Sequence, residues 1–395
     1  MTVTAVLVRG AQVFAPEPLG LVDVLSVGER IVAIGSELEL PSWADGVELD
    51  GRGALLMPGL IDQHVHIAGG GGEGGPQNRT PEIRLTDLTT AGITTVVGVL
   101  GTDGTTRSVA ELLAKARALE YEGITAWIYT GAYDVPTRTV TGSARRDIVL
   151  LDRVLGVGEV ALSDQRGSHP SPQALAELAT EARVGGLLSG KAGVLHLHLG
   201  SGRRHLQALI ELVDQHDIPI DTFVPTHLNR ARGLLADAVQ YGKRGGWLDI
   251  TSGIVPDAED REAVDPAEAL IDLSRQGIAW EHLSMSSDAQ GSAPKFDAQG
   301  ALTGMGIGRA DSLWQAVRRL VTDHALTWSE ALRPVTTTPA RILKLANVGR
   351  VAVGWQADFL LVRDREIESV IARGQWMVGQ GKPKRFGTFE NGKSP

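Results

Sequence analysis

The chain has 395 residues, in which 38 Lys and Arg stand against 47 Asp and Glu, so that its net charge at neutral pH is −9. This acidic balance argues against nucleic acid as a partner, because no excess of cations is available to neutralise phosphates. Cysteine is absent, which excludes disulfides and thiolate metal ligands and fits a reducing compartment. No signal-peptide pattern is seen at the N-terminus, and no apolar run approaches the roughly 20 residues that cross a membrane. We therefore expect a cytoplasmic protein without a membrane partner.

Both ends of the chain are patterned as short strands. Over residues 2–57, valine and isoleucine alternate with polar residues, and glycine or proline separates the runs. The same pattern returns from about Asn347. We predict that residues 1–57 and 345–395 together form one small β-sandwich domain.

Between these ends, apolar strands alternate with amphipathic helices. Eight strands are predicted, at Leu55–His66, Ile93–Leu100, Ile124–Thr130, Val157–Leu162, Val194–Leu199, Phe223–His227, Trp247–Thr251 and Leu283–Ser287. Helices are predicted at Thr80–Ala91, Ser108–Glu122, Pro172–Leu188, Arg203–His216, Arg232–Arg244, Pro266–Gln276, Asp311–Asp323 and Ser329–Leu343, with a weaker candidate at Asp147–Leu155. This α/β alternation matches a (β/α)₈ TIM-like barrel over residues 58–344. A doubly wound open sheet is the alternative that periodicity alone leaves open.

One stretch, PGLIDQHVHIAGGGGE at Pro58–Glu73, combines several reactive residues. Alternate residues of a strand point to the same side, so His64 and His66 project together and can hold one metal ion. An isolated pair of this kind is more often two polar residues on an exposed strand. The glycine run Gly69–Gly72 then carries Glu73, and it is either a flexible linker or a place where backbone approaches a ligand closely.

Further reactive residues fall near the carboxyl ends of the predicted strands, where barrel enzymes place their active sites. Five of the ten histidines lie in these strands. The reactive residues outside the first strand are Thr102, Tyr133, Glu159, Asp164, Arg166, His196, His198, His227, Arg230 and Asp288. Enough nitrogen and oxygen ligands for two divalent ions sharing a hydroxide are supplied by His64, His66, Glu159, His198, His227 and Asp288.

Two of these assignments have alternatives. His196 faces the same way as His198, and we prefer His198 because it lies nearer to the strand end. Asp288, in SSDAQGS, could ligate an ion, take a proton from the attacking water and pass it to the leaving amine. Taken alone, however, Asp288 is equally well explained as a strand-end cap.

The motifs together resemble the amidohydrolase superfamily, and within it the bacterial isoaspartyl dipeptidases. PGLIDQHVH, the histidines of strands five and six, and Asp288 carry the first likeness; GGGGE, VVGVLGTDG, TGAYDVPTRTVTGS, PTHLNR and SSDAQGS carry the second. The resemblance implies a (β/α)₈ barrel beside a β-sandwich, two zinc ions per subunit, and hydrolysis of the β-aspartyl bond in isoAsp-Xaa dipeptides. It also implies a homo-oligomer, often an octamer.

The resemblance further implies a role for individual residues. One ion would be held by His64, His66 and Asp288, and the other by His198 and His227. The remaining roles concern substrate: Glu73, helped by Ser292, would hold the α-amino group, Tyr133 the scissile carbonyl oxygen, and Arg166 and Arg230 the carboxylates, with Gly71 and Thr102 in contact.

Strand four departs from the pattern of the isoaspartyl dipeptidases. Those enzymes bridge their metals with a carboxylated lysine, whereas no lysine occurs here between Lys115 and Lys191. Glu159 is the only carboxylate inside this strand, and we interpret it as the bridge. Glutamate is shorter, so the backbone must come nearer to the metals, which Gly158 would permit. The alternative is a structural Glu159 and a single metal ion.

Two further hypotheses compete with dipeptide hydrolysis. One is another amidohydrolase activity, on N-acyl amino acids or cyclic amides; the other is a non-catalytic scaffold that kept the fold. Glu73, Tyr133, Arg166 and Arg230 favour a small zwitterionic substrate, since an isoaspartyl dipeptide carries one amine and two carboxylates. Retention of every histidine of the set argues against a scaffold.

Overall fold

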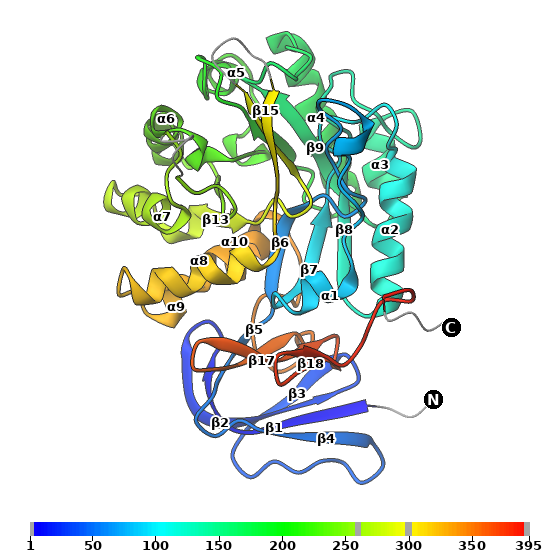
Figure 1. Ribbon diagram of the computed structural model, residues 1–395, viewed down its shortest axis with the longest axis vertical. Coiled ribbons are helices and arrows are strands. Elements are labelled where there is room, and N and C mark those ends of the chain that lie inside the picture. The colour runs from blue at the N-terminus through cyan, green and yellow to red at the C-terminus, as the bar shows by residue number, and fades with distance from the viewer. Residues whose placement is uncertain (1–3, 257–261, 297–301, 391–395) are drawn as a thin grey trace.

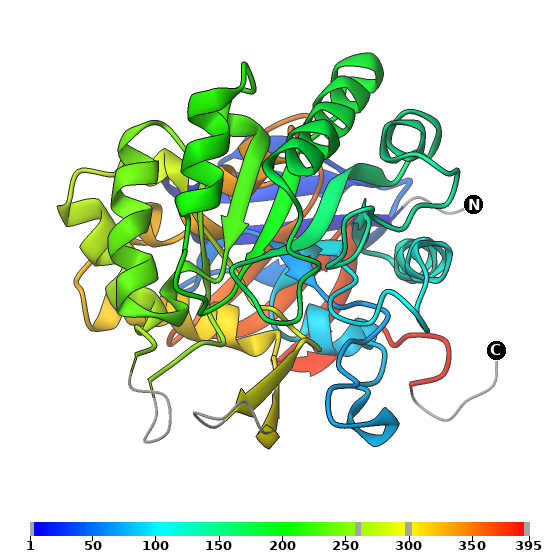
Figure 2. The same ribbon diagram turned by 90° about the horizontal axis from the view of Figure 1, so that it is seen from above.

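Two sheets organise the part of the chain that this computed structural model describes, residues 4–256, 262–296 and 302–390 (Figure 1). One sheet is built from both ends of the chain. The other is a curled parallel sheet surrounded by helices, seen from above in Figure 2. In Figure 1 the terminal sheet lies at one end of the curled sheet, where the N-terminal and C-terminal segments come together.

The terminal sheet joins nine strands. They are β1 (Thr4–Phe14), β2 (Pro18–Val27), β3 (Arg30–Gly35), β4 (Asp45–Asp50), β5 (Leu55–Pro58), β16 (Phe359–Arg363), β17 (Glu366–Ala372), β18 (Gln375–Gly379) and β19 (Lys382–Pro383). Their order is β19-β18-β17-β16-β5-β1-β2-β3, with β4 paired to β1, so they form one hydrogen-bonded sheet. Its apolar core includes Val6, Val8, Leu56, Phe359 and Ile371. The domain bounds, 1–57 with 345–395 and 58–344, stay a prediction that these pairings support.

The predicted strand Leu55–His66 is wrong as a single strand. β5 pairs with β16 in the terminal sheet, and the barrel strand β6 begins only at Leu60. The chain crosses between the two sheets at Gly59, where a Cβ atom would lie 2.2 Å from Thr94 Oγ1. Because glycine has no side chain, the backbone can pass close to Thr94 at this point. β5 therefore ends just before Gly59 and β6 begins just after it.

All eight predicted barrel strands are found in the described part of the chain. They are β6 (Leu60–Val65), β7 (Ile93–Gly98), β8 (Thr125–Thr130), β9 (Val154–Leu162), β10 (Leu195–Leu199), β11 (Phe223–Thr226), β12 (Leu248–Thr251) and β13 (Leu283–Ser286). Strands β6 to β11 are hydrogen-bonded in order, and β12 pairs with β13. The curled sheet with its ring of helices in Figure 2 is a TIM-type barrel and not a doubly wound open sheet.

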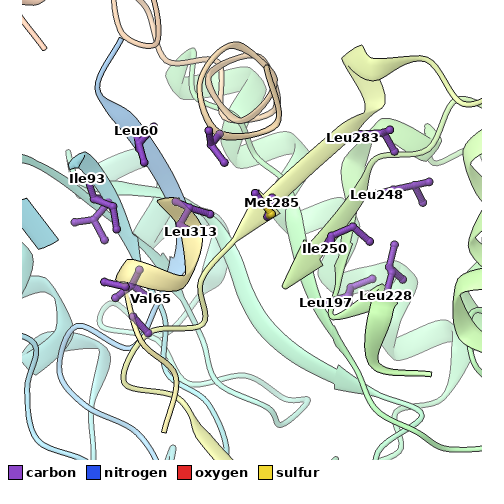
Figure 3. Close-up of a cluster of buried hydrophobic side chains, with 14 of the residues drawn as sticks. Leu60, Val65, Ile93, Leu197, Leu228, Leu248, Ile250, Leu283, Met285 and Leu313 are labelled. Atoms are coloured by element: carbon purple, nitrogen blue, oxygen red, sulfur yellow. The ribbon is translucent and has the colours of Figure 1, made fainter. Parts of the chain in front are cut away.

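Apolar side chains of these strands pack outward against the helices. Figure 3 shows part of this core, in which β6, β7, β12 and β13 contribute Leu60, Ile93, Ile250 and Met285, and the helix side contributes Leu313. All five side chains are fully buried. Burying the outer face of a parallel sheet under helices explains why its strands read as nearly continuous apolar runs.

The helices follow the prediction with three corrections. Their bounds are α1 (Leu85–Thr89), α2 (Val109–Glu122), α3 (Ala144–Leu150), α4 (Pro172–Ser189), α5 (Gln207–Gln215), α6 (Arg232–Lys243), α7 (Pro266–Arg275), α8 (Asp311–Thr322), α9 (Trp328–Ala331) and α10 (Thr337–Ile342). The helix predicted at Ser329–Leu343 is broken by a 3₁₀ turn at Arg333–Val335, because Pro334 has no N–H for a helical hydrogen bond. The helix predicted at Asp147–Leu155 begins and ends earlier, as α3. The helix predicted at Thr80–Ala91 is shortened at both ends, to α1.

A hairpin that sequence periodicity did not predict follows the eighth barrel strand. It consists of β14 (Ser292–Phe296) and β15 (Leu302–Ile307), paired antiparallel with Ser292 opposite Ile307. It begins four residues after Asp288 and so stands beside the carboxyl end of the barrel. Among the described residues, no helix is both long and apolar enough to cross a membrane.

A buried carboxylate closes the barrel where its backbone ladder is interrupted. β11 and β12 are not joined in one sheet, nor are β13 and β6. Asp249 on β12 is fully buried and accepts hydrogen bonds from Gln63 Nε2 at 2.6 Å, Thr226 Oγ1 at 2.6 Å, Ser284 Oγ at 2.7 Å and Ser286 Oγ at 2.6 Å. These donors lie on β6, β11 and β13, so one carboxylate ties together the strands that flank both interruptions.

Asp249→Ala should lower the free energy of unfolding by about 3 kcal/mol or more, because it leaves buried donors without an acceptor. Urea denaturation of the full chain measures this loss. Asp214→Ala, which removes an exposed ion pair with Arg244, is the matched control and should change stability by about 1 kcal/mol or less. Equal unfolding midpoints for the two variants would contradict the closing role of Asp249.

Candidate active site

The carboxyl ends of the barrel strands bring four histidines to one buried carboxylate. Glu159 on β9 places Oε1 at 3.5 Å from His64 Nε2 and 3.4 Å from His66 Nε2. Its Oε2 lies 3.0 Å from His198 Nδ1 and 3.6 Å from His227 Nε2. The Glu159 side chain is 1% exposed. One carboxylate thus lies between two pairs of imidazoles, which is the arrangement expected of a bridging ligand.

Asp288 approaches the first of these pairs from the end of β13. Its Oδ1 lies 3.4 Å from His64 Nε2 and 3.1 Å from His66 Nε2. Backbone hydrogen bonds hold the two strand ends together, since Asp288 N donates to His64 O at 3.1 Å and His66 N to Ala289 O at 2.9 Å. The six predicted ligands therefore gather in one cluster, and three overlapping groups of three have ligand atoms within 4.8 Å of one another.

The donor atoms of this cluster fit divalent ions. His64 Nε2, His227 Nε2 and Asp288 Oδ1 are buried and have no hydrogen-bond partner among the described residues. Leaving buried polar atoms unpaired is unfavourable, and coordination of a metal would satisfy them. The opposite ring nitrogens are engaged, as His64 Nδ1 lies 2.7 Å from His196 Nε2 and His227 Nδ1 lies 2.7 Å from Thr251 Oγ1. These contacts leave both Nε2 atoms directed at the cluster.

His196 lies one layer deeper in the barrel than His198. It stacks on Tyr129 with ring centroids 4.9 Å apart, and its Nε2 supports His64. His198 Nδ1 is the atom that reaches Glu159. The geometry therefore favours His198 over His196 as the ligand from β10.

Glycines make room for the cluster. A Cβ atom at Gly101 would lie 2.8 Å from His66 Cε1 and 3.2 Å from Glu159 Oε1. At Gly158 it would lie 2.8 Å from His196 Cβ, so the missing side chain lets β9 pack closely on β10. The strand that carries the short glutamate can thus lie near the histidines, as the sequence predicts.

The pKa values of the buried groups follow from their neighbours. Burial alone would raise the pKa of Glu159, but the charge of His64 and the contact with His198 outweigh it and hold the pKa well below its usual range. The same opposition applies to Asp288: burial alone would raise its pKa, but its contacts with the His64 and His66 imidazoles outweigh burial and hold the pKa well below its usual range. Burial, reinforced by the charge of Glu159, raises the pKa of Tyr133 well above its usual value. The two carboxyls are therefore anionic, and the phenol is a neutral donor.

Tyr133 reaches the cluster from the loop after β8. Its hydroxyl lies 2.9 Å from His198 Nδ1 and 3.2 Å from Nε2. The loop is held by Asp147, which accepts hydrogen bonds from Thr130 Oγ1 at 2.6 Å and from the backbone of Val140 and Thr141 at 2.8 Å each. Sequence reasoning missed this support, because Asp147 reads as an ordinary residue of a helix.

Glu73 lies in a preformed pocket of donors beside the cluster. Its Oε1 accepts from Thr102 Oγ1 at 2.8 Å and Arg166 Nη1 at 3.0 Å, and its Oε2 accepts from Ser292 Oγ at 3.0 Å. Burial would raise the pKa of Glu73, but hydrogen bonds from Thr102 and Ser292 and the charge of Arg166 lower it. Ser292 comes from the unpredicted hairpin, so β14 completes this pocket.

The glycine run that carries Glu73 is an ordered arm and not a linker. Arg107, a buried residue, donates from Nη1 to Ala68 O and from Nη2 to Gly70 O at 3.2 Å. Thr80 Oγ1 accepts from Gly70 N at 2.6 Å. Gly71 has φ of +73°, and a Cβ there would lie 2.5 Å from Asn78 O. Sequence reasoning missed Arg107 and Thr80, since their only signal is a polar residue near a predicted helix start.

The two predicted arginines differ in their surroundings. Arg166 contacts Glu73 and lies over the Tyr133 ring at 5.4 Å. Arg230 follows His227 in a 3₁₀ turn, and its buried Nε has no partner within the described ranges. Asn229 holds this turn by donating to Thr251 O at 3.1 Å and Val264 O at 3.0 Å.

Comparisons with known proteins agree with this geometry. Residues 55–377 match the amidohydrolase family. A solved structure, beta-aspartyl dipeptidase from Fervidobacterium islandicum AW-1 in complex with the dipeptide beta-Asp-Leu, is 41% identical, with 96% of this chain and 99% of that chain covered and a TM-score of 0.89.

Two curated relatives have activities that differ from that of the Fervidobacterium dipeptidase. Imidazolonepropionase of Pseudomonas paraeruginosa is 37% identical over 396 residues, which cover 91% of this chain and 90% of that protein. Adenine deaminase 2 of Shouchella clausii is 25% identical over 354 residues, with 87% of this chain covered, and the chain spans about half, 52%, of that deaminase. The match over residues 55–377 takes in the whole ligand cluster, and the chain belongs to the amidohydrolase family of metal-dependent hydrolases.

Proposed function

We propose that the protein is a metal-dependent dipeptidase that hydrolyses the β-aspartyl bond of isoAsp-Xaa dipeptides. The observation that carries this proposal is the pairing of a six-ligand cluster with one anion, Glu73, and two arginines, Arg166 and Arg230. An isoaspartyl dipeptide has one ammonium and two carboxylates, so its charges complement those of the site. The likeness to a protein crystallised with beta-Asp-Leu supports the same substrate class.

Two divalent ions, proposed to be zinc, would be held by this chain's own residues. His64, His66 and Asp288 would hold one, His198 and His227 the other, and Glu159 would bridge them. Histidine nitrogen and carboxylate oxygen are ligands that zinc accepts. Bound there, the ions would activate a water molecule near neutral pH and polarise the scissile carbonyl.

The substrate would be oriented by charged and neutral donors on different strands. Glu73 is anionic, because its pKa is lowered, and would accept the α-ammonium together with Ser292. Arg166 lies next to Glu73 and would bind the isoAsp α-carboxylate, a planar acceptor that suits a guanidinium. Arg230, whose Nε is free, would bind the carboxylate of the leaving residue.

Asp288 would transfer protons, and Tyr133 would stabilise the negative charge that develops on the substrate. Asp288 would take the proton of the attacking water and pass it to the leaving amine. Tyr133, kept protonated by its raised pKa, would donate to the scissile carbonyl oxygen as negative charge develops. Thr102 and Gly71 would complete the pocket wall.

Another amidohydrolase activity, on N-acyl amino acids or cyclic amides, is the second candidate, because a relative with a different activity, imidazolonepropionase, is 37% identical over most of the chain. Glu73 argues against it, since three donors hold this carboxylate ready for an ammonium group. A homo-oligomer, an octamer by resemblance, and a cytoplasmic location stay predictions.

A hydrolysis panel tests the substrate class. Zinc-loaded protein should hydrolyse isoAsp-Leu with a kcat/KM at least about 100-fold above that for Asp-Leu or N-acetyl-leucine. N-acetyl-leucine lacks the ammonium and one carboxylate, and Asp-Leu carries the same charges as isoAsp-Leu but in a different arrangement around the scissile bond. Release of free leucine provides the measurement. Comparable rates on N-acetyl-leucine would replace the dipeptidase proposal with hydrolysis of N-acyl amino acids.

Glu159→Gln should reduce bound metal from about two ions per chain toward one or none, because an amide is a poor bridging ligand. Metal analysis of the purified variant beside the wild type measures the loss. Glu181→Gln, which alters a carboxylate paired with Arg145 on the helix layer, serves as the control. Unchanged metal content in Glu159→Gln would assign Glu159 a purely structural role.

Asp288→Asn should lower kcat for isoAsp-Leu by about 10²–10⁴-fold, the range typical of general acid–base catalysis, because the amide cannot accept a proton. KM should change by only a few-fold, since Asp288 would not bind the substrate charges. Steady-state kinetics at saturating zinc, with metal content measured in parallel, separate a lost proton carrier from a lost ion. A kcat close to that of the wild type would remove Asp288 from this role.

A further inference from the structure

One carboxylate, Asp164, is shared by the metal cluster and the substrate pocket. It lies in the loop after β9, and its side chain is 7% exposed. Its Oδ2 lies 3.0 Å from His198 Nε2 and 2.8 Å from Arg166 Nη2. We propose that Asp164 is a positioning residue that aims His198 at the metal cluster and Arg166 at the substrate, an inference whose second half rests on the proposed function.

The contact with His198 determines which ring nitrogen can bind a metal. Nε2 faces Asp164 Oδ2 at 3.0 Å and Arg166 Nη2 at 3.3 Å, and Arg166 Nη2 donates to the same Asp164 oxygen at the shorter distance of 2.8 Å. Because a carboxylate only accepts hydrogen bonds, His198 donates from Nε2 to Asp164. Nδ1 then carries the lone pair, and Nδ1 is the atom that lies 3.0 Å from Glu159 Oε2. A ligand histidine whose other nitrogen donates to a carboxylate is held in one tautomer and one ring orientation. Asp164 supplies this restraint to His198.

Two other histidines of the cluster, His64 and His227, have neutral partners at the equivalent place, and the buried Nδ1 of His66 has no hydrogen-bond partner among the described residues. His64 Nδ1 lies against His196 Nε2, and His227 Nδ1 against Thr251 Oγ1. Within the described residues, His198 is therefore the cluster histidine whose second nitrogen faces a carboxylate outside the cluster. Loss of that carboxylate should lower the affinity for the ion held by His198 and His227 more than the affinity for the ion held by His64.

The same carboxylate determines the position of Arg166. Asp164 Oδ1 accepts from Arg166 N at 2.8 Å and Nε at 3.0 Å, and Oδ2 accepts from Nη2. The remaining nitrogen, Nη1, donates to Glu73 Oε1 at 3.0 Å. A guanidinium gripped on one edge presents its other edge in a fixed direction. Arg166 is thus held in place before any substrate carboxylate arrives.

Packing around Asp164 supports this role independently. The turn at Gly200–Gly202, which follows β10, lies directly on the loop that carries Asp164. A Cβ atom at Gly200 would lie 2.6 Å from Asp164 Cβ and 2.5 Å from Ser163 O, and Gly202 N donates to Ser163 O at 2.7 Å. The turn that follows the His198 strand therefore packs on the Asp164 loop and keeps Asp164 close to His198.

Asp164→Asn in the full-length protein tests the proposal with two readouts. Zinc affinity is measured by competition with a chelator. For the site formed by His198 and His227 it should fall by about 10–100-fold, because an amide N–H of Asn would oppose the Nε2–H of His198. At saturating zinc, KM for isoAsp-Leu should rise by about tenfold or more while kcat falls less, because Arg166 loses its charged anchor.

Two further variants keep the test decisive. Asp237→Asn removes a carboxylate from a histidine outside the site, His205, which it contacts at 2.9 Å, and should leave both readouts unchanged. Gly200→Ala retains the Asp164 charge but displaces it, and should weaken zinc binding in the same direction as Asp164→Asn. It replaces Asp164→Asn if circular dichroism shows that variant to be unfolded.

Wild-type zinc affinity in a folded Asp164→Asn protein, or in Gly200→Ala, would overturn the role toward His198. An unchanged KM would overturn the role toward Arg166. The zinc titration uses no substrate, so it decides the first role even if the wild type fails to cleave isoAsp-Leu. Such a failure would count against the proposed function and not against the positioning of His198.

Discussion

The attraction between Glu159 and four imidazoles is the interaction on which the site depends. Its two oxygens lie 3.0–3.6 Å from nitrogens of histidines that come from three other strands. The carboxylate is almost fully buried, and charge interactions are strong where water is excluded. Strands β6, β9, β10 and β11 must therefore keep a register that brings these side chains to one level. The glycines at 101 and 158 leave the space that this convergence needs.

The barrel supports this cluster by two polar networks, one below it and one beside it. Below, Asp249 gathers donors from β6, β11 and β13 and joins strands that the backbone ladder leaves apart. Beside it, Glu73, Arg166, Asp164 and His198 form a continuous chain of contacts. Substrate charges would meet groups that are already oriented, and such preorganised dipoles and charges need little rearrangement during a reaction.

Much of this arrangement could be predicted from the sequence, for identifiable reasons. Parallel strands that alternate with helices reveal the barrel, and its active residues gather where strands end, so the six ligand candidates were found by position. Asp249, Asp147 and Arg107 were missed because their partners lie elsewhere in the chain and have no local pattern. The hairpin β14–β15 was missed, and Pro334 divides a helix that apolar spacing alone extends across it.

By itself, the sequence determined the order of strands and helices and which side chains are available for metal and charge recognition, because these depend on local periodicity and residue chemistry. The sequence favoured His198 over His196 only by its nearness to the strand end, and the tertiary structure adds that His196 stacks on Tyr129 whereas His198 faces Glu159. The glycine run was equally ambiguous until Arg107 and Thr80 held its backbone. Such choices depend on distances between strands, which packing determines and residue spacing does not.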